Sequence, residues 1–117
     1  MGAASADDYG VLCAEIETLL DPVVAKEQSL ERLEDTLTEG YARALALEAE
    51  RLRLERRIGE LGAAVDAGHQ PTDEIATLAS RLSQASSRLD GLRALLAKLR
   101  RRADAVRTRT AAPLSGS

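Results

Sequence analysis

The feature that most constrains this chain is a heptad repeat in its C-terminal half. Between residues 75 and 106, all ten a and d positions of the repeat are apolar. An unbroken pattern of this kind is typical of a helix that packs along a narrow seam against another helix. The a positions are Ile75, Leu82, Leu89, Leu96 and Ala103, and the d positions are Leu78, Ala85, Leu92, Leu99 and Val106.

A second segment, residues 30–65, follows the same repeat. Nine of its eleven a and d positions are apolar, and the exceptions are Arg51 at a and Gly40 at d. An arginine at an a position commonly runs its apolar stem along the seam, keeps its charge in water and fixes the register. Binding of an anionic ligand is the alternative role for Arg51. The pattern therefore predicts a second coiled-coil helix.

Residues 67–74 separate the two segments and carry the signals of a turn. Gly68 suits the left-handed residue that ends a helix, and Pro71 cannot continue one. Asp73 and Glu74 favour the positive N-terminus of the next helix. Because a short connection makes long helices antiparallel neighbours, the sequence predicts an all-α fold. Its main element is a long antiparallel helical hairpin, a coiled coil, with an N-terminal helical arm or third helix.

The predicted boundaries follow from these signals and from the pair Asp21-Pro22. Asp is a common helix cap and Pro is favoured at the first helical position, so a long first helix is expected to start there. The predicted parts are a flexible N-terminus at 1–6, a helical arm at 7–21, the first helix at 22–67, a turn at 68–72, the second helix at 73–109 and a flexible tail at 110–117.

The register of the hairpin is also predictable from its irregular positions. Dense packing favours a large residue facing a small one, so Leu96 is expected opposite Gly40. The same register places Ala85 opposite Arg51. A shift by one heptad would set Ala103 on Gly40 and Leu92 on Arg51, which leaves a void and a clash.

Composition excludes several other classes of protein. The chain has two Tyr, no Phe, no Trp and one Cys. It therefore has too few β-branched and aromatic residues for a β-sandwich or barrel, and no internal disulfide framework. We find no apolar stretch of membrane-spanning length and no secretory signal, and we expect a cytoplasmic protein without a transmembrane segment.

We expect no enzymatic activity, no cofactor and no metal. His69 stands in the predicted turn without a cluster of further ligands, and Cys13 fits a small residue on an apolar stripe. The sequence contains no phosphate-binding loop, dinucleotide fingerprint or nucleophile elbow. A catalytic site is therefore not predicted.

Residues 7–28 have no partner in the second helix, although they carry apolar residues at heptad spacing. They can fold back as a third helix, or they can present their stripe to another chain. A hairpin with one narrow seam is marginally stable alone, so oligomerisation or a partner is expected. The candidate partner-binding residues are Leu12, Ile16, Leu19, Leu20, Val23 and Val24.

Charge is distributed unevenly along the chain. Residues 67–117 contain four acids and nine bases, a net of +5, while the whole chain carries −3. A basic helix can bind phosphates in a salt-sensitive way. Acidic neighbours on the first helix and the lack of aromatic residues for base stacking argue against nucleic acid as the partner. The candidate basic patch comprises Lys98, Arg100, Arg101, Arg102, Arg107 and Arg109.

Two families resemble parts of the chain. Residues 75–96 resemble the C-terminal helix of small coiled-coil subunits in the complexes for lysosome-related organelle biogenesis and lysosome positioning, and residues 19–24 are similar to the entry of their snapin-like members. The matching residues are Leu19-Leu20-Asp21-Pro22-Val23-Val24, Ile75, Leu82, Gln84-Ala85, Arg88-Leu89-Asp90 and Leu96. Residues 30–61 resemble helical flagellar export chaperones of the filament-junction type. Both resemblances imply binding to other helices.

These patterns predict a non-catalytic adaptor or scaffold subunit that joins other helical proteins, or copies of itself, through helix–helix contacts. Any membrane association is expected to be peripheral and to occur through partners. A helical chaperone or regulator that sequesters a client protein, similar to a flagellar export chaperone or an anti-sigma factor, is the alternative function. A basic-helix nucleic-acid binder ranks behind it.

Overall fold

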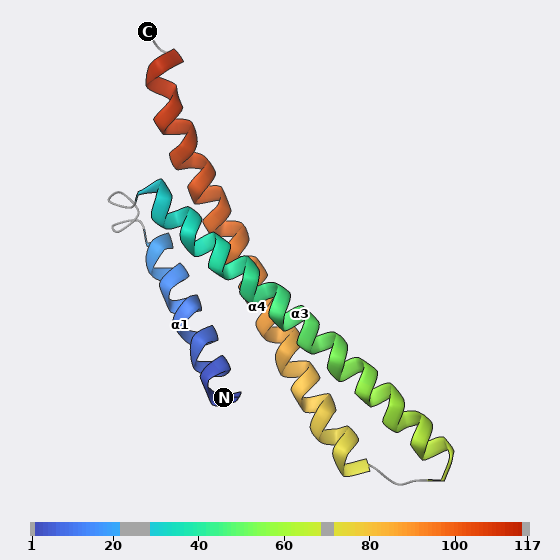
Figure 1. The fold of residues 1–117 in the computed structure, drawn as a ribbon. Coiled ribbons are helices and arrows are strands. Elements are labelled where there is room, and N and C mark those ends of the chain that lie inside the picture. The colour runs from blue at the N-terminus through green and yellow to red at the C-terminus, as the bar shows by residue number, and fades with distance from the viewer. Residues whose placement is uncertain (1, 22–28, 69–71, 116–117) are drawn as a thin grey trace. The chain divides into compact units, whose positions relative to one another are not determined.

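The structure of the chain is a computed structural model that describes residues 2–21, 29–68 and 72–115. These residues form three helices: α1, Gly2–Leu20; α3, Leu30–Asp66; and α4, Thr72–Ser115 (Figure 1). The described residues contain no strand. The prediction of an all-α fold is therefore confirmed.

The chain divides into two compact units, and α3 and α4 each contribute to both. Unit 1 comprises Met1–Arg43 and Leu92–Ser117, and unit 2 comprises Ala44–Gly91. Unit 1 thus contains α1, the first part of α3 and the last part of α4. Unit 2 is the hairpin formed by the rest of α3 and α4.

In unit 1, α1 packs antiparallel to α3 as a third helix (Figure 1). The guanidinium of Arg43 lies 3.3 Å from the Asp8 carboxylate, and that of Arg32 lies 3.5 Å from the Glu15 carboxylate. Residues early in α1 therefore meet residues late in this part of α3. Of the two alternatives for the N-terminal segment, the structure shows the third helix.

The core of unit 1 is formed by the heptad positions of α3 and α4 together with the apolar stripe of α1. Aliphatic side chains fill it, as expected for a chain without Phe or Trp. Its buried members are Leu12, Ile16, Leu19, Leu33, Leu37, Leu92, Leu96, Leu99 and Ala103.

The predicted register is confirmed in unit 1 at Gly40. A Cβ atom added to this glycine would collide with the Leu96 side chain, whose Cγ would lie 3.3 Å away. Leu96 is 2% exposed, so its side chain fills the space that the glycine leaves. The glycine at this d position is therefore a packing requirement, because a side chain there would push the helices apart.

Unit 2 has a narrower core that involves α3 and α4 alone. Leu54, Leu61, Leu78 and Ala85 are buried in one cluster. The turn leaves α3 through Gly68, whose φ of 100° lies in the left-handed region, as predicted. Its N–H donates to the Val65 carbonyl oxygen at 3.0 Å, which satisfies one of the free carbonyl groups at the end of the helix.

Helix boundaries differ from the prediction at three places. α3 begins at Leu30 instead of residue 22, because the Ser29 hydroxyl accepts a hydrogen bond from the Arg32 N–H and caps the helix there. α1 begins at Gly2, where an alanine-rich stretch favours helix over the predicted flexible N-terminus. α4 continues to Ser115 instead of ending at residue 109, through Ala111 and Ala112. The predicted start at Pro22 lies outside the described residues.

Candidate functional site

The predicted partner-binding stripe lies mostly in the core of unit 1. Leu12, Ile16 and Leu19 are 2%, 0% and 1% exposed, and Leu20 is half-buried. Val23 and Val24 lie outside the described residues. The prediction that this stripe is a free docking surface is therefore wrong for the three buried residues, because α3 and α4 of the same chain cover them.

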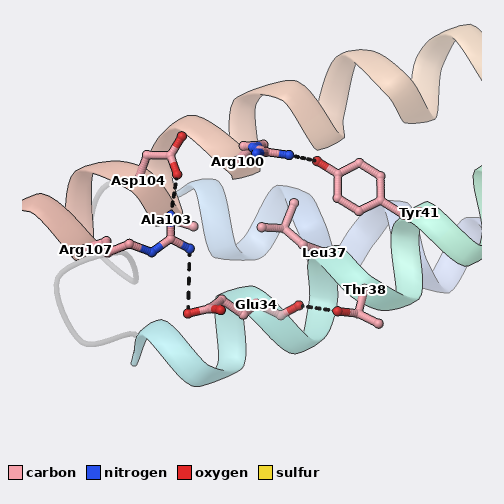
Figure 2. A pocket seen from close by; sticks show the side chains of 8 residues that line it. All are labelled: Glu34, Leu37, Thr38, Tyr41, Arg100, Ala103, Asp104 and Arg107. Atoms are coloured by element: carbon pink, nitrogen blue, oxygen red, sulfur yellow. Dashed lines mark hydrogen bonds and ion pairs between the residues drawn. The ribbon is translucent and has the colours of Figure 1, made fainter.

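The predicted basic patch is largely exposed, although Arg102 is half-buried. Figure 2 shows two of its members beside a shallow hollow between α3 and α4 of unit 1. The Arg100 guanidinium donates to the Tyr41 hydroxyl at 3.4 Å. This hydrogen bond raises the pKa of Arg100 above its ordinary value, and the charge of Asp104 acts in the same direction. Arg100 is therefore a permanent cation that is already engaged within the chain.

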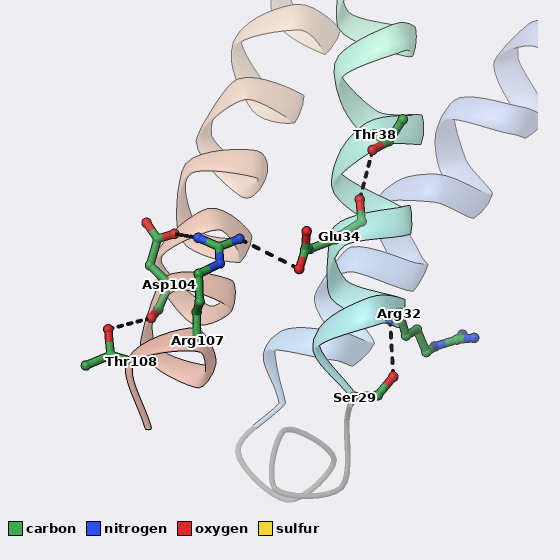
Figure 3. A network of polar contacts seen from close by, with 7 residues as sticks. All are labelled: Ser29, Arg32, Glu34, Thr38, Asp104, Arg107 and Thr108. Carbon is green, nitrogen blue, oxygen red and sulfur yellow. Dashed lines mark hydrogen bonds and ion pairs between the residues drawn. The ribbon is translucent and has the colours of Figure 1, made fainter. Parts of the chain in front are cut away.

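Arg107 is neutralised by two carboxylates, as Figure 3 shows. Its guanidinium lies 2.7 Å from Asp104 on the same helix and 3.8 Å from Glu34 on α3. All three side chains are about half exposed, so the pairs contribute only about 0–1 kcal/mol each to stability. Two acids next to two arginines leave little excess positive charge at the hollow. The arrangement orients the helices and does not form a site for an anion.

The two flanks of the α3–α4 seam differ in unit 1. In an antiparallel hairpin, the heptad e positions of both helices line one flank and the g positions line the other. The e flank of unit 1 carries Glu34, Tyr41, Arg100 and Arg107, which bond across it. On the g flank, Thr36 is 3% exposed and donates to the Glu15 carboxylate of α1 at 3.5 Å. In unit 1, the third helix thus covers the g flank, which also carries Arg102 and Arg43, the latter paired with Asp8 of α1.

In unit 2 the g flank carries an ion pair between the two helices. The Arg57 guanidinium lies 3.2 Å from the Glu74 carboxylate on α4 and 3.4 Å from that of Glu60. Its hydrogen bonds to Glu74 and Glu60 raise its pKa above the ordinary value. Glu50 and Arg81 occupy the neighbouring g positions. This flank of unit 2 has the charged character of the e flank in unit 1.

The e flank of unit 2 carries both small and acidic side chains. Gly62 on α3 and Ala79 and Ser86 on α4 occupy three of its e positions, and the acids Glu48 and Glu55 occupy the other two. Side chains at a positions lean toward this flank. In unit 2 the a residues Ala44 and Leu89 are buried, but four others are only partly covered. We call these partly exposed apolar a residues the open seam: Ile58, Val65, Ile75 and Leu82.

Exposed leucines extend the apolar surface along α3 in unit 2. Leu45 is 67% exposed and Leu52 is 51% exposed. They stand one heptad apart at b positions, which lie next to the e positions on the helix surface. Val65, in the open seam, is 36% exposed. Large apolar side chains therefore line one side of unit 2, as at many protein interaction sites.

Gly62 has no packing role within the described structure. A Cβ atom at Gly62 would meet no heavy atom within 4 Å, in contrast to Gly40. A glycine in a helix interior costs about 0.5–1 kcal/mol relative to alanine. Because glycine has no side chain, the e flank of unit 2 is unobstructed at this position.

We therefore expect Gly62→Ala to raise the free energy of unfolding by about 0.5–1 kcal/mol, because it removes backbone freedom from the unfolded chain and introduces no clash. Urea denaturation followed by circular dichroism measures this change. A loss of stability in Gly62→Ala would show that the space beside this glycine is occupied, contrary to the structure.

The described residues hold neither a cluster of metal ligands nor a membrane-spanning helix beside this surface. Within the described ranges, no group of three or more His, Cys, Asp or Glu side chains could hold a metal ion. None of the helices in those ranges is long and apolar enough to cross a membrane. His69 lies outside the described residues, and Cys13 is half-buried in α1.

Comparison of the chain with protein families, curated proteins and solved structures finds no significant match.

Proposed function

We propose that the protein is a non-catalytic adaptor that binds a helix of another protein along the open seam of unit 2. The observation that supports this proposal is the incomplete burial of apolar a positions in a seam that is otherwise packed. Ile58, Ile75 and Leu82 are half-buried and Val65 is 36% exposed, while the d positions beneath them are buried. Covering these side chains would gain about 25 cal/mol for each Å² of apolar surface removed from water.

Unit 1 supplies the precedent for such a docking event. There α1 lies against the same pair of helices and buries Leu12, Ile16 and Leu19 at helical spacing. It covers the g flank, where Asp8 pairs with Arg43 and the Glu15 carboxylate accepts a hydrogen bond from Thr36. An amphipathic helix likewise matches the heptad spacing of the open seam of unit 2.

The adaptor and the chaperone alternatives differ in the lifetime of the complex. An adaptor subunit forms a stable heteromer of fixed stoichiometry, whereas a chaperone releases its client. The surface of unit 2 serves either role, and dissociation kinetics of the isolated complex distinguish them. The adaptor role is our proposal because the surface is a narrow seam suited to one helix rather than a large cavity that could enclose a client.

A pair of charge insertions tests the proposed function. We expect Gly62→Glu combined with Ala79→Glu to abolish complex formation, because both carboxylates would stand on the e flank of unit 2 and would be desolvated by a docked helix. The fold should persist, since Gly62 has open space around it and Ala79 is exposed. Light scattering coupled to size-exclusion chromatography measures the stoichiometry of the complex purified from the native host.

The matched control places the same two charges on the outward faces of the same helices. Ala63→Glu combined with Ser80→Glu changes two exposed residues at f positions, away from the seam. This variant should retain the complex. If both double variants formed the complex equally well, docking at the e flank would be refuted. If only the control variant lost the complex, the interface would lie on the outer face of the hairpin.

A further inference from the structure

The charges that border the open seam of unit 2 are acidic. The b and e positions of α3 and α4 form its edges, because they lie next to the a positions on the helix surface. Among the described residues of unit 2, these positions carry four acids and no base. The acids are Glu48, Glu55 and Asp66 on α3 and Asp90 on α4. A helix that docks on the open seam would therefore meet a negatively charged edge.

The bases of unit 2 do not reverse this sign. Arg51, at an a position, is paired with Glu55, and 3.9 Å separate its Nε atom from the carboxylate. The other bases occupy c, f and g positions, on the outer faces and the g flank: Arg53, Arg56, Arg57, Arg81 and Arg88. Because a carboxylate has two oxygens that each accept hydrogen bonds, the pair with Arg51 leaves Glu55 able to accept from a partner.

Along α3, leucine and glutamate alternate at this edge. Leu45, Glu48, Leu52 and Glu55 follow one another at spacings of three and four residues, so they form one stripe on the helix. Both leucines are more than half exposed. Lys and Arg have an apolar stem and a charged head. A basic side chain on a docked helix can lay its stem against a leucine and reach the neighbouring carboxylate, which neither a neutral nor an acidic side chain can do.

The edge along α4 has a different character. Its b and e positions beside the open seam carry small uncharged residues: Ala76, Ala79, Ser83 and Ser86. Three of them are exposed and Ser86 is half-buried. A helix on the open seam would therefore lie between two unlike edges, with leucines and acids along α3 and small side chains along α4.

A second copy of the chain does not supply the complementary charge. Its own open seam would bring the same four acids, and like charges across an interface are unfavourable. α1 contains four acids and no base. The basic end of α4 does not fit either, because the apolar residues beside its bases, Leu96, Leu99 and Ala103, are buried in unit 1. Charge complementarity therefore favours a helix of another protein.

We propose that the open seam selects a basic amphipathic helix, with an apolar heptad stripe that is bordered by Lys or Arg on the edge that lies along α3. This inference rests on the proposed function and adds the chemistry of the partner. The apolar stripe would cover the open seam, and the basic side chains would lie across the stripe that runs from Leu45 to Glu55. The acids would also attract such a helix during its approach, so binding should weaken as salt is added.

Four synthetic peptides test the proposal against the full chain. Each is a helix of about three heptads with Leu at its a and d positions. Three of them carry Lys, Gln or Glu at every e and g position. The fourth, the matched control, has Gln at e and g and the same number of Lys residues at the outward b and c positions. Fluorescence anisotropy of the labelled peptide measures its affinity. We expect the Lys-edged peptide to bind about tenfold more tightly than the Gln-edged and control peptides, and the Glu-edged peptide to bind least.

Variants of the protein establish that the acids on α3 cause the preference. Glu48→Lys combined with Glu55→Lys should prefer the Glu-edged peptide over the Lys-edged one. A reversal of preference cannot arise from loss of structure, and circular dichroism of the variant confirms that the helices persist. The matched control, Asp35→Lys combined with Glu39→Lys, makes the same change in net charge at exposed residues of α3 in unit 1. It should keep the preference for the Lys-edged peptide.

The outcomes separate this inference from the proposed function. Gly62→Glu combined with Ala79→Glu should block the Gln-edged peptide, which offers no base to the new carboxylates. If it does, but the four peptides bind the unaltered protein equally well, docking at the open seam stands and selection of a basic edge is refuted. If none of the peptides binds, both proposals fail.

Two further results would also overturn the selection of a basic edge. If the control peptide binds as tightly as the Lys-edged peptide, the attraction depends on net charge and not on the edge of the seam. If the protein without peptide self-associates, and Gly62→Glu with Ala79→Glu abolishes the self-association, a second copy is the occupant of the open seam.

Discussion

Ile16→Asp should lower the free energy of unfolding by about 4 kcal/mol and release α1 from unit 1. Ile16 is fully buried in the three-helix core, so aspartate there would lose the apolar contacts and bury a carboxylate without a partner. Urea denaturation measures the loss, and amide hydrogen exchange locates it. We expect faster exchange along α1 and at the residues of α3 and α4 that it covers, while unit 2 retains its protection.

The control for this substitution lies on the same helix. Val11 is 67% exposed, so Val11→Asp should change stability by no more than about 0.5 kcal/mol. If Ile16→Asp were as well tolerated as Val11→Asp, α1 would not belong to the core of unit 1. In that event the stripe of Leu12, Ile16 and Leu19 would again be the candidate partner surface.

Gly40→Leu should be strongly destabilising unless Leu96 is shortened at the same time. The new side chain would occupy the space that Leu96 fills, and overpacking of this kind costs about 1–3 kcal/mol. Leu96→Ala alone should cost about 2–5 kcal/mol because it leaves a cavity at a residue that is 2% exposed. Exchanging the large and small residues, Gly40→Leu with Leu96→Ala, should recover a large part of both losses.

A double-mutant cycle in urea measures this coupling. The loss in the double variant should fall short of the sum of the single losses by about 1–3 kcal/mol, as for residues in direct contact. Additive losses would show that Gly40 and Leu96 do not face each other. The register of the α3–α4 seam in unit 1 would then be wrong, together with the packing reason for the glycine.

The hairpin and its register were predictable because they depend on a pattern that the chain repeats many times. The a and d residues define the seam whichever side of it is covered, and Gly40 opposite Leu96 distinguishes one register from its neighbour. The start of α3 was not predictable in the same way. Asp21-Pro22 is a good start signal, but Ser29 is also a cap, and the choice between them depends on how the preceding helix packs.

The candidate site could not be placed from the heptad pattern, because that pattern does not state which flank a third helix covers. The apolar stripe of α1 was recognisable, and so was its need for a partner, but its partner proved to be the same chain. The signal for the open seam was present in the small e residues Gly62, Ala79 and Ser86, which share this flank with Glu48 and Glu55. The sequence pattern does not show that the a positions beside them are incompletely buried, and this burial is what defines the open seam.

We propose different tasks for the two apolar surfaces of the chain. The stripe on α1 completes the core of unit 1 and contributes to its stability. The open seam of unit 2 is partly exposed, and we propose that a partner helix covers it. Gly62→Ala should strengthen the fold, whereas a carboxylate at the same position should block binding. Two substitutions of Gly62 therefore test different properties: alanine tests its effect on stability, and a carboxylate tests its effect on binding.

The most direct test of docking at the open seam is an amide NMR titration of the labelled protein with a synthetic amphipathic helix of about three heptads that has Leu at its a and d positions. We predict shift changes at Ile58, Gly62 and Val65 on α3 and at Ile75 and Leu82 on α4, with the α1 amides unchanged. Shift changes that are confined to α1 or to the basic residues of α4, or the absence of any change at saturating peptide, would contradict the proposal that this surface binds a helix.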